Sequence, residues 1–142
     1  LTGNGAGNTL RGLDGDDRIE GGGGSDVIEG GGGRDVLRGG AGDDLFVFAS
    51  TADSPSRAAS DAIWDFAAGD RIDLSALDAI EATAGVDDAF VLDAGGTFAA
   101  GEIRQVQDGS HWRIEAETNG DGIADLVILL GGHGTPLGAD DF

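Results

Sequence analysis

The stretch that decides the fold is residues 3–47, which reads GNGAGNTLR GLDGDDRIE GGGGSDVIE GGGGRDVLR GGAGDDLFV when it is divided every nine residues. With some departures, the five copies follow the pattern G-G-x-G-x-D-x-U-x, where U is a large apolar residue. A fixed short period means that one structural unit is repeated and that its copies stack on one another. We therefore expect a repeat architecture.

The composition of one copy predicts a turn followed by a short strand. Glycine at positions one, two and four lets the backbone adopt left-handed conformations and turn its carbonyl oxygens inward. Position six supplies a side-chain oxygen at a fixed offset from those carbonyls, and position eight supplies one apolar side chain for a core. The position-six residues are Asn8, Asp17, Asp26, Asp35 and Asp44, and the position-eight residues are Leu10, Ile19, Ile28, Leu37 and Phe46.

A turn and a three-residue strand cannot bury an apolar side chain alone, so we expect successive copies to alternate between two facing sheets. Each coil then takes two copies, and copy n lies beside copy n+2. This register places Arg11 beside Glu29 and Glu20 beside Arg38, and opposite charges on neighbouring strands are favourable. The predicted fold class is all-β, with a parallel β-roll over residues 1–48 and an antiparallel β cap over residues 49–142.

The stacked carboxylates require a cation between the turns. Because the ligands are all oxygen atoms, with no Cys in the chain and no His nearby, they select calcium over zinc or copper. Two other interpretations are a flexible acidic linker and a phosphate-binding glycine loop. A linker does not explain Asp and aliphatic residues that recur every nine positions, and the acidic excess disfavours phosphate.

The nonapeptide resembles the RTX, or haemolysin-type, calcium-binding repeat. The resemblance implies that each ion lies between turns n and n+2, held by carbonyl oxygens and by two position-six side chains. It implies a middle site of Leu13, Gly15, Asp17, Gly30, Gly32 and Asp35. It implies a second site of Gly22, Gly24, Asp26, Gly39, Ala41 and Asp44. An earlier site would use Asn4, Ala6, Asn8, Gly21, Gly23 and Asp26, and we expect it to be the weakest of the three because Asn8 is uncharged.

The bulk composition narrows the possible partners. A net charge of −19, a pI near 4.1 and the absence of Lys argue against nucleic acid and against anionic membranes. The lack of Cys rules out disulfides, which suits an extracellular protein that is stabilised by metal. No apolar run is long enough to span a bilayer and no signal peptide is recognisable. Because the chain begins at Leu1, we expect a piece of a longer protein.

Beyond the repeats, the sequence leaves two further metal positions open. A degenerate sixth turn puts Asp53 at its sixth position, with Asp61 as a rival. Residues 118–125, TNGDGIAD, resemble an EF-hand loop through Asn119, Asp121 and Asp125, but Ile128 stands where the twelfth-position Glu is expected. We favour a hairpin turn there over a further calcium site.

The rest of the cap is expected to be strands. SDAIWDF and GDRIDLSAL (residues 60–66 and 69–77) indicate two strands joined by a turn, then a short helix over residues 75–80. Trp64 and Phe66 are two apart and are expected to pack in the core. Residues 90–130 indicate an antiparallel meander whose last strand is buried on both faces.

No catalytic constellation is recognisable. His111 and His133 lie outside any metal or catalytic motif, so surface or packing roles are expected, and no Ser/His/Asp or Cys/His set can be assembled. The stretches FVFAS, SDAIWDFAAGDRIDLSALDA, TNGDGIADLVILLGG and LGADDF extend the resemblance to the C-terminal domain of serralysin-type secreted zinc proteases.

That wider resemblance implies a non-catalytic, calcium-folded accessory domain. It implies export through a type I ABC transporter in the unfolded state, an extracellular location, and an upstream catalytic domain, for which a zinc metalloprotease is the candidate. The competing hypothesis is a module that binds an anionic polysaccharide such as alginate, as in the R-modules of mannuronan C5-epimerases. The few arginines, Arg11, Arg34 and Arg38, do not share one column, which weighs against it.

Overall fold

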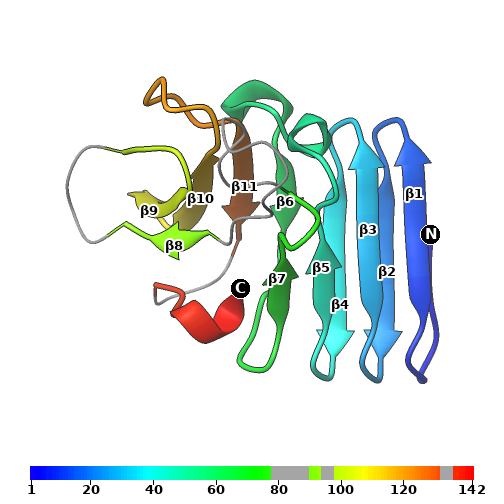
Figure 1. Cartoon of the computed structure of the whole chain (residues 1–142). Coiled ribbons are helices and arrows are strands. Elements are labelled where there is room, and N and C mark those ends of the chain that lie inside the picture. Colours follow the sequence, from blue (N-terminus) through cyan, green and yellow to red (C-terminus); the bar gives the residue numbers. More distant parts are fainter. Residues whose placement is uncertain (78–89, 94–97, 132–135) are drawn as a thin grey trace.

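The computed structural model describes residues 1–77, 90–93, 98–131 and 136–142. Apart from three short 3-10 turns, the regular structure in these residues is β-strand, which confirms the all-β class. Figure 1 shows a two-layered stack of parallel strands that begins at the N-terminal edge and continues into a cap of antiparallel strands. The elements are β1 (Thr9–Asp14), β2 (Arg18–Gly23), β3 (Val27–Gly32), β4 (Val36–Ala41), β5 (Leu45–Val47), η1 (Thr51–Asp53), η2 (Arg57–Ala59), β6 (Asp61–Ile63), β7 (Arg71–Asp73), β8 (Val91–Leu92), β9 (Glu102–Asp108), β10 (His111–Glu117), β11 (Leu126–Leu130) and η3 (Ala139–Asp141).

The strands of the repeats form the predicted parallel β-roll. One sheet has the order β1-β3-β5-β7, and the other begins β2-β4-β6, so each strand pairs with the strand two further along the chain. Leu10 lies opposite Ile28, and Ile28 lies opposite Phe46. The period of nine therefore predicted both the stacking and its register.

The two charge columns follow from the same register. Arg11 lies opposite Glu29, and their side chains form an ion pair at 2.9 Å. Glu20 lies opposite Arg38 as predicted, although the ion pair of Glu20 is with Arg18 on its own strand. Exposed pairs of this kind contribute at most about 1 kcal/mol each, so they support the register more than they stabilise the roll.

The core of the roll is built from the eighth position of each copy. Ile19, Ile28, Leu37 and Phe46 are completely buried between the two sheets, and Leu10 at the open end is partly buried. Burial of each such side chain contributes roughly 1.5–3 kcal/mol. The single apolar position of the nonapeptide is thus the inward position of a two-sheet stack.

Both sheets of the roll continue past residue 48. β6 pairs in parallel with β4, and β7 pairs in parallel with β5, which adds Ile63 and Ile72 to the buried core. Residues 60–66 and 69–77 thus contain strands, as expected, but these strands lie in opposite sheets. The division of the chain at residues 48 and 49 stays a prediction, and the strands on either side of it share both sheets.

The cap is joined to the roll through one strand. β11 pairs in parallel with β6 and antiparallel with β10, and β10 pairs antiparallel with β9. Leu126, Val127, Ile128 and Leu130 of β11 are buried, in agreement with its continuous apolar sequence. The expectation of a fully antiparallel meander was wrong at its start. β8 pairs in parallel with β9, with Val91 opposite Glu102 and Leu92 opposite Ile103.

Trp64 does not pack in the core, which corrects the prediction that grouped it with Phe66. Phe66 is buried, but 44% of Trp64 is exposed. Asp61 and Ile63 are buried, so the alternation of β6 places Trp64 on the outer face, and Phe66 turns inward only after the strand has ended. The Trp64 indole lies against Gly131, where a Cβ atom would collide with the ring.

Two further expectations reach residues that the structure does not describe. Of the expected helix over residues 75–80, only residues 75–77 are described, and they form a turn. His133 also lies outside the described residues. Among the residues that are described, none of the helices is long and apolar enough to cross a membrane.

Candidate metal centre

The position-six side chains stand in two columns, one at each edge of the roll. Each of these residues lies just before or at the start of a strand, so the parallel pairing of the strands stacks them directly. One column contains Asp17, Asp35 and Asp61, and the other contains Asn8, Asp26, Asp44 and Asp70. We call these the position-six columns.

Within each column, one carboxylate oxygen is used by the backbone. The amide of each residue donates to the Oδ1 atom of the next residue in its column. The N···O distances are 2.7 Å from Asn8 to Asp26, 2.9 Å from Asp26 to Asp44, 2.9 Å from Asp44 to Asp70, 2.8 Å from Asp17 to Asp35 and 2.7 Å from Asp35 to Asp61. These bonds fix the orientation of every carboxylate after the first.

The second carboxylate oxygen is left buried and without a partner. The Oδ2 atoms of Asp26, Asp35, Asp44 and Asp61 make no hydrogen bond, although these residues are at most 2% exposed. A buried ionised oxygen without a partner is strongly unfavourable, and native structures rarely contain one. Four such atoms in two stacked columns form a site that suits a cation.

Backbone carbonyl oxygens converge on the same spaces. A Cβ atom at Gly21 would collide with Asp26 Oδ2 and lie 2.6 Å from the Gly39 carbonyl oxygen, and one at Gly30 would collide with Asp35 Oδ2. Glycine at position one therefore leaves a space beside the unpaired oxygen that any other residue would fill. The polar atoms nearest to these Cβ positions are oxygens, which are the ligand atoms that calcium prefers.

Burial makes these carboxylates reluctant to ionise without a cation. Desolvation raises the pKa of Asp35, Asp44 and Asp70 above the usual value, against the opposing effect of the backbone hydrogen bonds that they accept. For Asp61, burial raises the pKa to about 8, with repulsion from Asp35 as a smaller cause. A bound divalent cation would remove this penalty by pairing with the ionised form.

In the structure, the residues of the predicted middle site lie on one pair of neighbouring turns, and those of the second site lie on another pair. In the middle site, Asp17 and Asp35 share a hydrogen bond, the Leu13 and Gly15 carbonyls face the next turn, and the Gly32 carbonyl accepts from Gly15 N at 2.7 Å. In the second site, the carbonyls of Gly22, Gly24 and Gly39 face across the same kind of gap, and Ala41 O lies close to Gly23. Ligation by these residues stays a prediction.

The earliest predicted site differs at its side chain. Asn8 Oδ1 accepts a hydrogen bond from Asn4 N at 2.8 Å, so the amide oxygen is already used within its own turn. The Asn4 carbonyl accepts from Gly23 N at 2.8 Å, and the carbonyls of Gly21 and Ala6 lie at the same junction. These contacts favour the expectation that this site is the weakest.

Side chains alone do not form a metal cluster. Across the described residues, no group of three or more His, Cys, Asp or Glu side chains is arranged to hold a metal ion. A cation in the roll must therefore take much of its coordination from backbone carbonyls. That requirement fits calcium, which accepts six to eight oxygen ligands of mixed type, and it does not fit a structural zinc site.

Sequence reasoning missed Asp70 and ranked Asp61 second. Asp61 and Asp70 occupy the next level of the two columns, whereas Asp53 uses its Oδ2 atom to accept from Ala49 N and Ser50 N. The missed signal is the D-x-I pattern, which recurs nine residues apart at Asp61-Ala62-Ile63 and Asp70-Arg71-Ile72.

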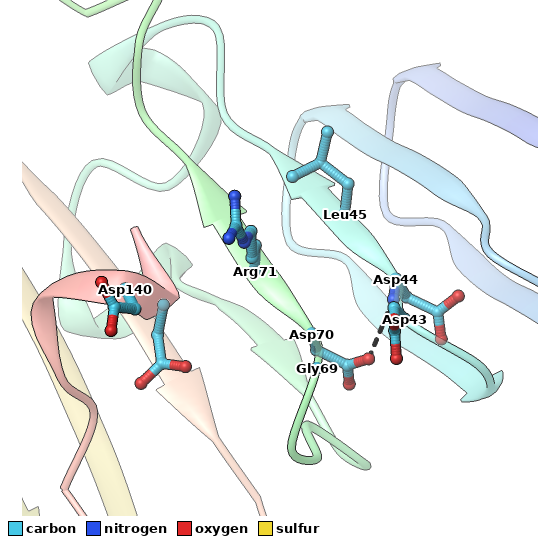
Figure 2. Close-up of a pocket in the computed structure, with 8 residues that line it drawn as sticks. Asp43, Asp44, Leu45, Gly69, Asp70, Arg71 and Asp140 are labelled. Carbon is cyan, nitrogen blue, oxygen red and sulfur yellow. Dashed lines mark hydrogen bonds between the residues drawn. The ribbon is translucent and has the colours of Figure 1, made fainter.

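An acidic pocket of about 460 Å³ lies at the outer level of one column. Figure 2 shows Asp43, Asp44 and Asp70 on neighbouring turns of the roll, with the hydrogen bond from Asp44 to Asp70 drawn, and Asp140 approaching from the C-terminal turn. Arg71 is the basic residue that lines it. The pocket is the open continuation of the position-six column.

The histidine that the structure describes has a packing role. The His111 ring contacts the edge of Trp64 with centroids 5.5 Å apart and an interplanar angle of 88°. This agrees with the expected surface or packing role.

The architecture and the columns define a class, a parallel β-roll that is capped by an antiparallel sheet. The family model described as "Peptidase M10 serralysin C terminal" matches residues 10–142, and the chain therefore belongs to the serralysin C-terminal family of peptidase M10. This family is the non-catalytic C-terminal part of secreted serralysin-type proteases. No curated protein sequence matches the chain.

Two solved structures share the fold. The solution structure of the AlgE6R2 subunit from the Azotobacter vinelandii mannuronan C5-epimerase has a TM-score of 0.62 and 29% identity, and the match covers 99% of this chain and 89% of that chain. The AlgE6R3 subunit of the same epimerase has a TM-score of 0.55 and 30% identity, with coverage of 96% and 77%. Both are similar to this chain over the roll and the cap together.

Proposed function

We propose that this chain is a calcium-binding domain that folds on its metal and forms the C-terminal part of a protein secreted by a type I system. The observation that carries the proposal is the set of buried, unpaired Oδ2 atoms of Asp26, Asp35, Asp44 and Asp61. The polar atoms nearest to the position-one glycines beside them are oxygens, and a resident cation would neutralise charges that the fold otherwise leaves unpaired.

About three ions are proposed, each between turns n and n+2, with the ligand sets predicted from the sequence. Asp26 would serve two of them, because it lies between Asn8 and Asp44 in its column. Asp61 and Asp70 extend the two columns by one level. Asp61 keeps an unpaired Oδ2 atom and would act in the same way there, whereas Asp70 Oδ2 already accepts from Ala67 N at 2.9 Å. The chain's contribution is to hold these oxygens in register, while calcium supplies the positive charge.

The metal dependence would make the folding of the domain depend on the calcium concentration of its compartment. A stretch of glycine-rich repeats has high conformational entropy and little apolar surface to bury. At the low calcium concentration of the cytosol it would stay unfolded, a state that a type I ABC transporter can pass. Extracellular calcium, about 10⁻⁴–10⁻³ M for weak sites, would then fold it.

The proposal assigns no catalysis to this chain. The whole protein would carry its active site upstream, and a zinc metalloprotease is the parent that the family indicates. The domain would assist secretion and extracellular folding of that parent.

A calcium titration followed by circular dichroism tests the proposal. Wild-type chain in EDTA should show a coil spectrum for the repeats and should gain strand signal on addition of calcium. Asp26→Ala should raise the calcium midpoint by about tenfold, because it removes a charged ligand from two sites. Asn8→Ala is the matched control and should raise it much less.

Two results would contradict the proposal. A strand spectrum and a sharp melt that are indifferent to EDTA would show that the roll does not need metal. Equal effects of Asp26→Ala and Asn8→Ala would show that the ligand register is wrong.

A second candidate function, binding of an anionic polysaccharide, is favoured by one surface feature. Trp64 is exposed at the end of β6, and its amide donates to Leu37 O at 3.1 Å, which sets it beside the exposed Arg38. An aromatic face beside a guanidinium suits a uronate sugar, and the two epimerase subunits share the fold. Alginate binding in calcium that is lost in Trp64→Ala would support this function, and no binding by the wild type would reject it.

A further inference from the structure

Outside the roll, the turn between β10 and β11 holds a buried carboxylate that the fold does not satisfy. Glu117, the last residue of β10, is completely buried, and its Oε2 atom has no hydrogen-bond partner. Its Oε1 atom accepts from Asn119 N at 2.9 Å and from Gly120 N at 2.6 Å, so the carboxyl group lies under the first residues of the turn. An unpaired buried oxygen beside a polar loop points to a cation.

The same loop presents oxygen donors at alternate positions. Counted from Glu117 as position one, Asn119 stands at three, Asp121 at five, Ile123 at seven and Asp125 at nine. Position six is Gly122, with φ of +80°. Calcium loops of the EF-hand type take ligands from positions one, three, five, seven and nine, with a carbonyl at seven and a glycine at six for the sharp turn.

The hydrogen bonds draw the two ends of the loop together. Asp125 Oδ2 accepts from Thr118 N, and Asp125 Oδ1 accepts from Asn119 Nδ2, both at 2.8 Å. Because Asn119 also donates its amide to Glu117, the carboxylates of Glu117 and Asp125 border the same residue. At the tip, Asp121 Oδ1 accepts from Ile123 N at 2.7 Å, which directs the Asp121 side chain along the inside of the turn.

The loop also departs from the EF-hand type in a way that the structure explains. The twelfth position is Ile128, which is completely buried in the centre of β11 and pairs with Ile114. The loop carries its glutamate, Glu117, at the first position instead, at the end of β10. The carboxylates are not gathered into a three-acid cluster in the described residues, so Asn119 Oδ1 and the Ile123 carbonyl would have to complete the ligand set.

We propose that residues 117–125 bind one divalent cation of the calcium type, independently of the roll. Glu117, Asp121 and Asp125 supply the negative charge, and oxygen-only donors select calcium over transition metals. The site would fasten the β10–β11 turn to the neighbouring segment, since Gly101 N donates to Glu117 O at 2.8 Å and the Phe98 carbonyl lies close to Gly122.

The test uses the full chain at saturating calcium, with two measurements. The first is the number of calcium ions bound per chain, by equilibrium dialysis with metal analysis. The second is the NMR shift of the Gly122 amide during the calcium titration. Asp121→Asn, whose amide oxygen can still accept from Ile123 N, should weaken the loop site by about tenfold or more. At the calcium concentration that just saturates the wild-type chain, this variant should therefore bind one ion fewer than the wild type.

The controls separate this site from the roll. Asp108→Asn removes a carboxylate at the opposite end of β10, where it pairs with Arg57 and Arg113, and should leave the ion count unchanged. Asp26→Ala should lose roll ions and keep the Gly122 response. Glu117→Gln, which can still accept from the Asn119 amide, should lose the Gly122 response with an unchanged strand spectrum. An unshifted Gly122 amide in wild-type chain, or an equal ion count in wild type, Asp121→Asn and Glu117→Gln, overturns the proposal.

Discussion

At the scale of single residues, the backbone conformation that stacking requires is clearest where the sequence departs from the nonapeptide pattern. Position two of copies three to five is a glycine with positive φ, at Gly22, Gly31 and Gly40. Copy two has Leu13 there instead, with φ of +79°. Among the described residues, Leu13 is the one non-glycine residue with a positive φ. The stacking therefore imposes a left-handed conformation on a residue that disfavours it.

Leu13→Gly should therefore stabilise the calcium-bound domain. The left-handed conformation costs about 1–2 kcal/mol for a residue with a Cβ atom, and the side chain is 70% exposed, so little burial is lost. The neighbouring exposed residue Asp14, which lacks a positive φ, is the matched control. Thermal unfolding in excess calcium should show a higher midpoint for Leu13→Gly and a lower one for Asp14→Gly, and a lower midpoint for both would contradict the strain.

At the scale of elements, what could be predicted follows from what one period contains. The period specifies a turn, one inward residue and one ligand position, so the strands β1 to β5, their register and the position-six columns could be read from residues 3–47. β6 and β7 could not be placed, because the segment between β5 and β6 is eight residues longer than the nine-residue period allows. The spacing within a column then changes from 18 residues to 26.

The cap was less predictable because its strands depend on tertiary pairing. β9, β10 and β11 show alternating or continuously apolar patterns, and these predicted the antiparallel core. The parallel pairing of two residues in β8 leaves no pattern. Trp64 was misplaced because the alternation of β6 buries Ile63 and exposes Trp64, whereas Phe66 lies beyond the end of the strand and is buried independently of that alternation.

The position-one glycine provides a prediction about the turn as a unit. Gly21→Ala should prevent the turn from closing, because the added Cβ would collide with Asp26 Oδ2 and approach the Gly39 carbonyl oxygen to 2.6 Å. Both are part of the packed junction and cannot move apart cheaply. We expect the free energy of unfolding of the calcium-bound domain to fall by about 1–3 kcal/mol or more, as at other overpacked core sites.

Gly5→Ala is the control for that substitution. A Cβ atom on Gly5 meets nothing within 4 Å, and its φ is not positive. Chemical denaturation in excess calcium should leave Gly5→Ala within about 0.5 kcal/mol of wild type. If Gly21→Ala unfolds with the same free energy as Gly5→Ala, the position-one space is not a packed feature of the roll.

At the scale of the whole molecule, the fold concentrates negative charge. The chain carries −19 formal charges, and the position-six columns place part of that charge where water is excluded. The cap shows the opposite solution. Burial alone would raise the pKa of Glu115, but hydrogen bonds from Arg113 and Arg104 hold it below its usual value. The cap thus pairs the carboxylate of Glu115 with arginine, whereas the buried Oδ2 atoms of the roll have no partner among the described residues.

This contrast predicts how the stability of the metal-free domain depends on pH. The pKa values of Asp35, Asp44, Asp61 and Asp70 are raised in the folded chain, to about 8 for Asp61. The folded state therefore binds protons more tightly than the unfolded state, whose Asp pKa is about 3.9. Their contribution to stability is complete below that value and is lost as the pH rises towards about 8.

In EDTA the repeats should therefore be coil at neutral pH, and their strand signal in circular dichroism should rise along a measurable slope as the pH is lowered from about 8 towards about 5. In saturating calcium the slope should flatten or reverse, because the cation favours the ionised carboxylates and must compete with protons at low pH. Asp61→Asn removes the most perturbed carboxylate and should make the metal-free domain less sensitive to pH. A metal-free stability that rises through this range in the wild type would show that the columns are already paired, and the case for a cation between the turns would fail with it.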